Sequence, residues 1–403
     1  MFWKNSKSNQ SQATERSPLQ NSNFPYLSLS DHYFDTACQT LRPQSVIDSE
    51  MEYYTQANAC GGRASYPWAR RVDARIEEVR KDFLKLLGLS GKEYLTFFGL
   101  NTTQGINTVL WAMPWQEFDT IITTDIEHNS VFLPVMKIAK HFGKKRIILE
   151  RDTDGNVIYE TKDLSRAVVI LNTTSNIDGR ELGNREELIK DVHSQGGIVI
   201  LDACQTLGHH PQALSKTQAD VILGSGHKMY GPSLGIGAIK RSLTEKLDPM
   251  TIGGGTVSGV SRDDYTLLNG DDLSHRLEPG LQNWAGIWAM KPTLEFLRNA
   301  DWQQERDLSH TVHDILQQNQ VTLLSQPESS VQTFYIPGLE SSLVGDLLAK
   351  KNIMVRTGYF CCHYYLTEKH PLPHLVRLSL GQHTRQEDIE ALREAMQGIG
   401  KLR

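Results

Sequence analysis

Short apolar runs alternate with amphipathic stretches between about residues 69 and 285. Val168–Leu171 is apolar at four consecutive positions, which is typical of a strand covered on both faces. The alternation predicts an α/β fold, in which helices cover a parallel sheet. The strands are predicted at 94–98, 119–124, 145–149, 167–171, 197–201, 220–224 and 235–239, and the helices at 69–88, 103–112, 131–142 and 184–195.

The pattern changes after about residue 285. A helical stretch over 284–298 leads into a smaller α+β segment that ends in a helix near 386–399. The first residues are rich in Ser, Asn, Gln and Lys and cannot bury enough apolar surface to offset the entropy of ordering. We therefore expect four parts: a disordered polar tail (1–25), an N-terminal segment packing with the small domain (26–68), a large domain (69–284) and a small C-terminal domain (285–403).

Composition narrows the class of protein. Of the 403 residues, 39% are hydrophobic and 22% are charged, which fits a soluble globular protein. The net charge of −5 indicates no nucleic-acid partner, and no apolar stretch approaches the length of a membrane span. The N-terminus has no signal-peptide core, so a cytoplasmic location is expected. The cysteines and histidines show no disulfide or metal-ligand spacing, so no metal is expected.

Two reactive side chains follow predicted strands. Lys228 lies among small residues directly after the apolar run 221–223, and Asp202 ends the run 198–201. A lysine amine can form an imine with the aldehyde of pyridoxal phosphate (PLP), and a carboxylate can keep the pyridine nitrogen protonated. The pair therefore predicts a PLP site.

Polar residues follow three more strands. Asn101–Gly105 opens a helix, where backbone N–H groups could hold a phosphate. Glu127–Asn129 and Ser175–Asn176 follow two other strands. Because ligands of open α/β sheets bind beyond the carboxyl ends of the strands, we expect these residues to converge on one rim.

These motifs resemble the class V aminotransferase family, fold type I of the PLP enzymes, and most closely the Suf-type (group II) cysteine desulfurases. The resemblance extends from about Tyr33 to the C-terminus. It rests on motifs in the family's order: Asp125–Ser130, Ser175–Asn176, Asp202–Gln205, Ser225–Pro232, Gly253–Gly255 and Arg356–Cys361. It implies a large domain with a mainly parallel sheet, a smaller α+β C-terminal domain and a homodimer.

The resemblance also implies roles for single residues. Lys228 would be the Schiff-base lysine and proton shuttle, and Cys361 would be the nucleophilic thiol. Arg377 would bind the substrate carboxylate, a task that suits a planar guanidinium. His128 would stack on the ring and move protons. The other implied cofactor contacts are Asp202 at the ring nitrogen, Asn176 (also near substrate) and Gln205 at the ring hydroxyl, and Thr103, Ser225 and His227 at the phosphate.

Several functions stay open. The leading hypothesis is a cysteine desulfurase that takes sulfur from L-cysteine through a Cys361 persulfide and releases alanine, with a possible sulfur-acceptor protein. The alternatives are a cysteine or cystine C–S lyase acting by β-elimination, an aminotransferase of small amino acids, and a non-catalytic scaffold. Cys361 could also be a small apolar filler, and the adjacent Cys362 could take its place.

The chain departs from the Suf-type pattern in three places. Tyr359 and Phe360 stand where two histidines usually precede the cysteine, and this form resembles molybdenum-cofactor sulfurases. Leu281 replaces a threonine that reaches the partner subunit's phosphate. Residues 58–62 lack the usual histidine. Together these departures predict a divergent member with an altered substrate or sulfur acceptor.

Overall fold

A central sheet of eight strands dominates the computed structural model, which describes residues 22–62 and 64–400. The five middle strands, β8, β7, β6, β3 and β4, are parallel, whereas β9 and β5 run antiparallel to their neighbours. In spatial order the strands are β2 (Tyr94–Gly99), β9 (Gly235–Lys240), β8 (Val221–Ser225), β7 (Ile198–Asp202), β6 (Ala167–Asn172), β3 (Thr120–Thr124), β4 (Lys145–Arg151) and β5 (Val157–Ile158). The predicted mainly parallel sheet is confirmed, and only the two-residue β5 was missed.

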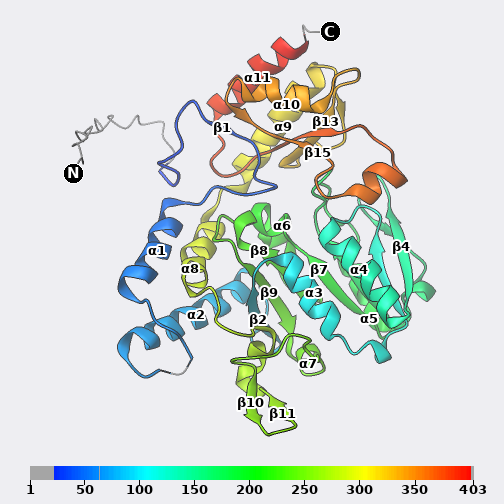
Figure 1. Cartoon of the computed structure of the whole chain (residues 1–403). Coiled ribbons are helices and arrows are strands. Elements are labelled where there is room, and N and C mark those ends of the chain that lie inside the picture. Colours follow the sequence, from blue (N-terminus) through cyan, green and yellow to red (C-terminus); the bar gives the residue numbers. More distant parts are fainter. Residues whose placement is uncertain (1–21, 63, 401–403) are drawn as a thin grey trace, which may run out of the picture.

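Helices cover both faces of this sheet (Figure 1). The side chains of β6 show why its strand is apolar throughout. Val169 and Leu171 pack into the core formed with α2, α5 and α8, while Val168 and Ile170 pack into the core formed with α3 and α4. The helices are α2 (Pro67–Leu86), α3 (Thr102–Ala112), α4 (Asn129–Phe142), α5 (Arg185–Ser194) and α8 (Trp284–Asn299).

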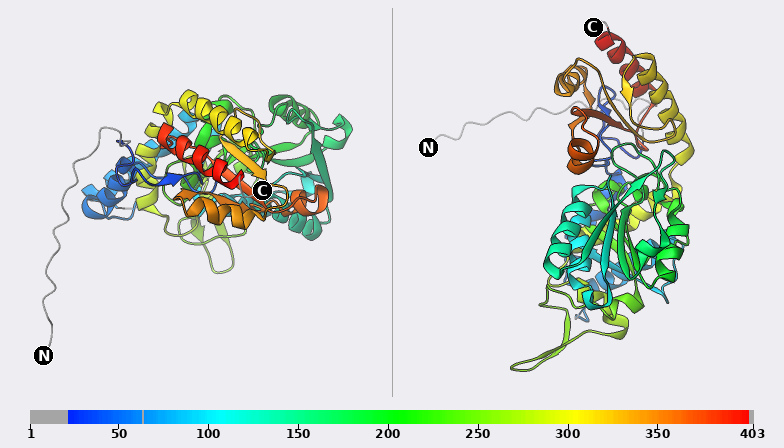
Figure 2. Two further views of the ribbon diagram at one scale, coloured as in Figure 1. Left: turned by 90° about the horizontal axis from the view of Figure 1, so that it is seen from above. Right: turned by 90° about the vertical axis from the view of Figure 1, so that its right-hand side faces the viewer.

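The C-terminal part forms a second lobe above the large sheet (Figure 2). Its antiparallel sheet has the order β12 (Thr322–Leu323), β13 (Val331–Tyr335), β16 (Leu375–Ser379) and β15 (Arg356–Gly358). Its helices are α9 (Trp302–Gln318), α10 (Ser341–Ala349) and α11 (Gln386–Gly400). The N-terminal strand β1 (His32–Tyr33) pairs in parallel with β14 (Ile353–Met354) of this lobe.

Phe24 is part of the packed structure, although it falls in the polar tail expected over residues 1–25. Residues 1–21 lie outside the described residues, but Phe24 is 1% exposed and meets the Phe296 ring edge-on at 5.9 Å. The following segment is divided between the lobes. Residues 32–35 join the small lobe, whereas α1 (Gln44–Gln56) packs against α8. The side chains of α8 lie in the large-sheet core, so the small lobe begins after α8 rather than at residue 285.

The remaining elements are short. A hairpin of β10 (Val257–Val260) and β11 (Tyr265–Leu267) extends away from the large lobe (Figure 1). The others are α6 (Thr206–His209), α7 (Arg241–Thr244), a π-helix (Tyr364–Lys369) and 3-10 turns at 115–117, 161–164, 211–214, 226–228 and 270–277. Within the described ranges no helix combines the length and apolarity that crossing a bilayer requires.

Candidate active site

One cavity of about 290 Å³ lies at the carboxyl ends of the strands, beneath the small lobe. β2 runs in the same direction as β8, because each is antiparallel to β9, so both strands end at this edge. The structure brings every predicted site residue together here: Lys228, Asp202, His128, Cys361, Thr103, Asn176, Gln205, Ser225, His227 and Arg377.

Tight backbone packing holds the segment that carries Lys228. Directly after β8, residues 226–228 form a 3-10 turn, and the Gly226 N–H donates to the Leu234 carbonyl at 2.8 Å. Only glycine fits at position 208, since an added Cβ would lie 1.9 Å from the Lys228 carbonyl oxygen. The Thr40 N–H donates to the His227 carbonyl at 2.9 Å. The lysine is therefore placed by contacts from three separate segments.

Asp202 and Gln205 lie beside this turn, because β7 pairs with β8. Asp202 is 6% exposed, and its Oδ1 accepts the Cys204 N–H at 3.1 Å. The Gln205 amide donates to the Ala37 carbonyl at 2.9 Å. Its Oε1 is buried without a donor among the described residues. Because buried polar atoms are normally paired, this oxygen fits a ligand that brings a hydroxyl into the cavity.

The beginning of α3 provides a cradle for an anion. Asn101 caps the helix by accepting the Gln104 N–H at 2.9 Å, and the Thr102 N–H donates to the Ser225 hydroxyl at 3.0 Å. The helix dipole gives this end of α3 a partial positive charge, which favours a phosphate. Thr103 lines the cavity but its hydroxyl bonds Ser130 at 2.7 Å, while the buried Thr102, whose role was not predicted, bonds Ser225.

His128 is neutral in this setting. It caps α4, and its Nδ1 accepts the Ser130 N–H at 3.1 Å, which leaves the proton on Nε2. Burial, and secondarily the Lys228 charge, lower the pKa of His128 to about 4. His227 behaves similarly, because burial and Lys228 lower its pKa to about 4.

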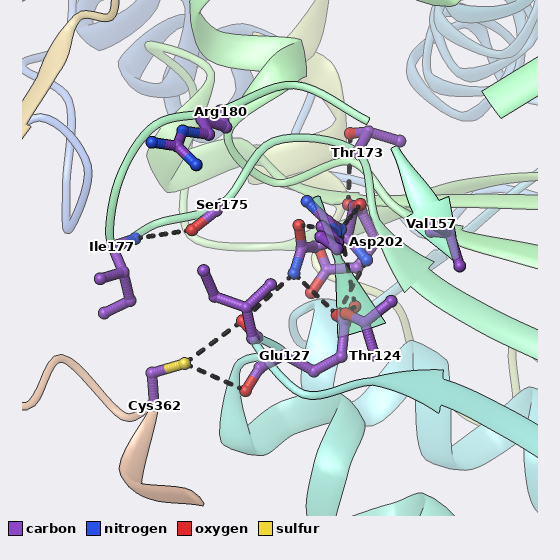
Figure 3. A network of polar contacts seen from close by, with 12 residues as sticks. Thr124, Glu127, Val157, Thr173, Ser175, Ile177, Arg180, Asp202 and Cys362 are labelled. Atoms are coloured by element: carbon purple, nitrogen blue, oxygen red, sulfur yellow. Dashed lines mark hydrogen bonds and ion pairs between the residues drawn. The ribbon is translucent and has the colours of Figure 1, made fainter. Parts of the chain in front are cut away.

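A buried carboxylate supports the rim from below (Figure 3). Glu127 accepts hydrogen bonds from the Thr124 hydroxyl at 2.5 Å and from the Asn172 backbone and amide at 2.8 and 2.9 Å. Arg151 lies 3.7 Å from its Oε1. Burial raises the pKa of Glu127 to about 7. This network joins the ends of β3 and β6, and Asn172 and Arg151 are too distant in sequence from Glu127 to be predicted as its partners.

Arg377 is 3% exposed rather than a surface ion-pair residue. Its Nη1 donates to the Asn176 carbonyl at 3.1 Å, and its guanidinium lies 4.6 Å from the Phe360 ring centre. Its Nε is buried without an acceptor among the described residues, so it can still receive a carboxylate. Asn176 in turn donates its amide to the Phe360 carbonyl at 2.9 Å.

An ion pair that was not predicted closes this side of the cavity. The Asp35 carboxylate accepts both Nε and Nη2 of Arg356, the latter at 2.8 Å, and lies 3.6 Å from Nη2 of Arg377. Arg356 belongs to the recognised motif and could have been named from it. Asp35 had no sequence signal, because only the pairing of residues 32–35 with the small lobe brings it here.

The two adjacent cysteines have different surroundings. Cys361 is exposed, lines the cavity and follows Phe360 on a loop with positive φ at both residues, 58° and 47°. Cys362 is fully buried, and its thiol donates to the carbonyls of Ile126 and Glu127 at 3.2 and 3.3 Å (Figure 3). Burial raises the pKa of Cys362 well above its usual value. Of the two thiols, only that of Cys361 is therefore accessible from the cavity.

Comparisons with known proteins agree with this geometry. A family model described as Aminotransferase class-V matches residues 32–392. A Pasteurella multocida (strain Pm70) protein named "Probable cysteine desulfurase" is 30% identical, over 93% of this chain and 90% of its own length.

Two solved structures share the fold and are similar in sequence. A cysteine desulfurase from Thermococcus onnurineus NA1, in its apo form, has a TM-score of 0.83 at 27% identity and covers 92% of this chain and 95% of its own. The cysteine desulfurase CsdA from Escherichia coli, in an S-sulfonic acid form, has a TM-score of 0.83 at 26% identity, with coverages of 94% and 97%. The family match over most of the chain and the shared fold show that this protein belongs to the class V aminotransferase family.

Proposed function

We propose that this PLP-dependent enzyme is a cysteine desulfurase, which transfers sulfur from L-cysteine to Cys361 and releases alanine. Relatives and structural neighbours named cysteine desulfurase support the proposal. The observation that carries it is the placement of the exposed Cys361 thiol in the same cavity as Lys228 and Arg377. A reactive thiol would have no function there in a simple aminotransferase.

The cavity fits the cofactor that the family uses. The residues that would hold it are Lys228 at the aldehyde, Asp202 at the ring nitrogen, Asn176 and Gln205 at the ring hydroxyl, His128 on the ring face, and Thr103, Ser225 and His227 at the phosphate. When bound, PLP supplies an electron sink for the bond changes at the substrate α-carbon.

The chain's own side chains account for the remaining steps. Arg377 binds the substrate carboxylate through its free Nε, which orients the α-carbon toward Lys228. The Lys228 amine removes the α-proton. Neutral His128 has a proton on Nε2 that can be donated in the cavity. The Cys361 thiolate attacks the substrate Sγ, the C–S bond breaks, and a persulfide forms on Cys361.

The test is to incubate the purified protein anaerobically with L-cysteine and to quantify alanine, pyruvate and protein persulfide. We expect alanine and persulfide from the wild type and neither from Cys361→Ser. Cys362→Ser is the matched control, because a serine hydroxyl can make the same two hydrogen bonds to carbonyl oxygens. Persulfide formation that persists in Cys361→Ser would refute the role of this thiol. Pyruvate as the main product would select the lyase, and product that depends on a keto acid would select transamination.

We also propose that the protein is a cytoplasmic homodimer that passes sulfur to an acceptor protein. Leu100, which precedes the cavity-lining Asn101, and Leu281 are each 75% exposed. A second copy of the chain would cover such apolar side chains. Sedimentation velocity of the wild type and of Leu281→Asp tests the dimer, and cell fractionation tests the location. A monomeric wild-type protein would contradict the proposed homodimer.

A further inference from the structure

Three of the five cysteines line the active-site cavity: Cys38, Cys204 and Cys361. Cys204 is held as a thiol, since its S–H donates to the Thr102 hydroxyl at 2.9 Å and burial raises its pKa to about 12. Cys38 is only half-buried and has no role in the function proposed above. The cavity therefore contains a second accessible thiol besides Cys361.

The backbone around Cys38 is fixed on both sides. The Ala37 N–H donates to the Ser379 hydroxyl at 2.9 Å, and the Ala37 carbonyl accepts the Gln205 amide at 2.9 Å. The Thr40 N–H donates to the His227 carbonyl at 2.9 Å. These bonds join the segment to the small lobe and to the turn that carries Lys228, so Cys38 is a fixed part of the cavity wall.

Two guanidinium groups lie within electrostatic range of the Cys38 sulfur, those of Arg356 and Arg377. The Asp35 carboxylate between them and the Tyr33 hydroxyl oppose their effect in part. Arg377 retains a buried Nε without an acceptor among the described residues. Once the carboxylate of the alanine product has left, this cationic group is free to stabilise an anionic sulfur nearby.

Arg377 also connects Cys38 to the loop of the first thiol. Its guanidinium lies 4.6 Å from the ring of Phe360, the residue that directly precedes Cys361. The same guanidinium group thus lies within electrostatic range of the Cys38 thiol and contacts the residue that precedes Cys361. This arrangement points to transfer of sulfur from Cys361 to Cys38 inside the site, before the sulfur leaves the protein.

We propose that Cys38 is a second sulfur carrier, which accepts the outer sulfur of the Cys361 persulfide. The inference rests on the desulfurase function proposed above. The Cys38 thiolate attacks the outer sulfur of Cys361–S–SH, a new S–S bond forms on Cys38, and the old S–S bond breaks. Its electron pair stays on Cys361 as a thiolate, and Cys38 becomes Cys38–S–SH. The step needs no oxidant or reductant, because the transferred sulfur keeps its oxidation state.

The consequence is a change in stoichiometry. With Cys361 as the only carrier, one subunit can release one alanine before it needs an acceptor. If Cys38 takes the first sulfur, Cys361 is regenerated and the subunit can release a second alanine. The number of alanine molecules that each subunit releases in the initial burst, without reductant or acceptor, therefore equals the number of sulfur carriers in the cavity.

The experiment mixes PLP-loaded enzyme anaerobically with a small excess of L-cysteine, without reductant, and quenches the mixture during the burst. Alanine is counted per subunit, and persulfides are alkylated and located by peptide mass spectrometry. We expect two alanines and a sulfur adduct on both Cys38 and Cys361 in the wild type. In Cys38→Ala we expect one alanine and an adduct on Cys361 alone. Cys60→Ser, an exposed cysteine outside the cavity, is the control and should keep the burst of two.

A wild-type burst of one alanine, with the adduct on Cys361 alone, would overturn the relay and leave the desulfurase function standing. This result needs no variant, so it is decisive even if Cys38→Ala folds poorly, and Cys38→Ser provides a second substitution. A burst of two in a folded Cys38→Ala protein would also overturn the relay. Absence of both alanine and persulfide would refute the proposed function itself and the relay with it.

Discussion

Glu127→Gln tests the buried carboxylate beneath the cavity. The folded protein raises the pKa of Glu127 from 4.5 to about 7, mainly because burial removes water from the charged form. Between these two values the folded protein keeps the proton and the unfolded chain loses it. The free energy of unfolding therefore falls as pH rises through this window. Since one pKa unit is worth about 1.36 kcal/mol, the loss amounts to about 3 kcal/mol.

Glutamine cannot titrate, yet it keeps the size of the side chain and can still accept from Asn172. The free energies of unfolding of the wild type and Glu127→Gln should therefore diverge with pH. We expect the wild type to lose about 3 kcal/mol relative to the variant between about pH 4.5 and pH 8.

Urea-induced unfolding of the full chain, followed by tryptophan fluorescence across this pH range, measures the difference. Glu245→Gln is the matched control, because Glu245 is exposed on the surface, and its difference from the wild type should not change with pH. Parallel pH curves for the wild type and Glu127→Gln would refute the reasoning, and would mean that Glu127 is ionised in the fold throughout this range.

Three further predictions follow from single contacts. Gly208→Ala places a Cβ 1.9 Å from the Lys228 carbonyl oxygen. We therefore expect the variant to lose about 1–3 kcal/mol of stability and to show weaker visible absorbance from bound cofactor. Gly398→Ala, in open space within α11, is the control and should be neutral or stabilising in thermal melting. Arg377→Lys loses the second donor for a carboxylate, and we expect kcat/KM for L-cysteine to fall by about 30-fold or more (about 2 kcal/mol), mostly through KM; an unchanged KM would exclude the carboxylate role. The pKa of His128 is about 4 in the folded protein, below its unfolded value of 6.5, so the side chain stays neutral at pH 6. Its contribution to the free energy of unfolding is lost only as pH falls from 6.5 toward 4. An NMR titration of the His128 ring with a midpoint near 6.5 would contradict this.

Much of the architecture was predictable because it depends on hydrophobic patterns within short stretches of the chain. The run Val168–Leu171 is apolar on both faces, and the structure buries it between two cores. Lys228 and Asp202 could be paired from sequence, because parallel strands present their carboxyl ends at one edge. The helix predicted over 103–112 is observed over 102–112.

Other features of the site depend on contacts between distant segments. The resemblance named Arg377 but not its partner Asp35, which comes from the N-terminal segment 342 positions earlier in the chain. Residue 24 falls within the polar tail that the composition predicts, and only the contact of Phe24 with Phe296 shows that it is packed. Sequence periodicity carries no information about such pairings.

The sequence by itself determined most strands of the large sheet, its mainly parallel arrangement and the polar residues at its edge, because periodicity and strand ends are local properties. It left open which cysteine faces the cavity, since Cys361 and Cys362 are neighbours of the same chemical type. Tertiary structure decided this by exposing one thiol to the cavity and burying the other against two carbonyl oxygens. The placement of Cys38 in the same cavity as Arg356 and Arg377 was decided in the same way, because solvent access and electrostatic surroundings arise only when distant segments pack together.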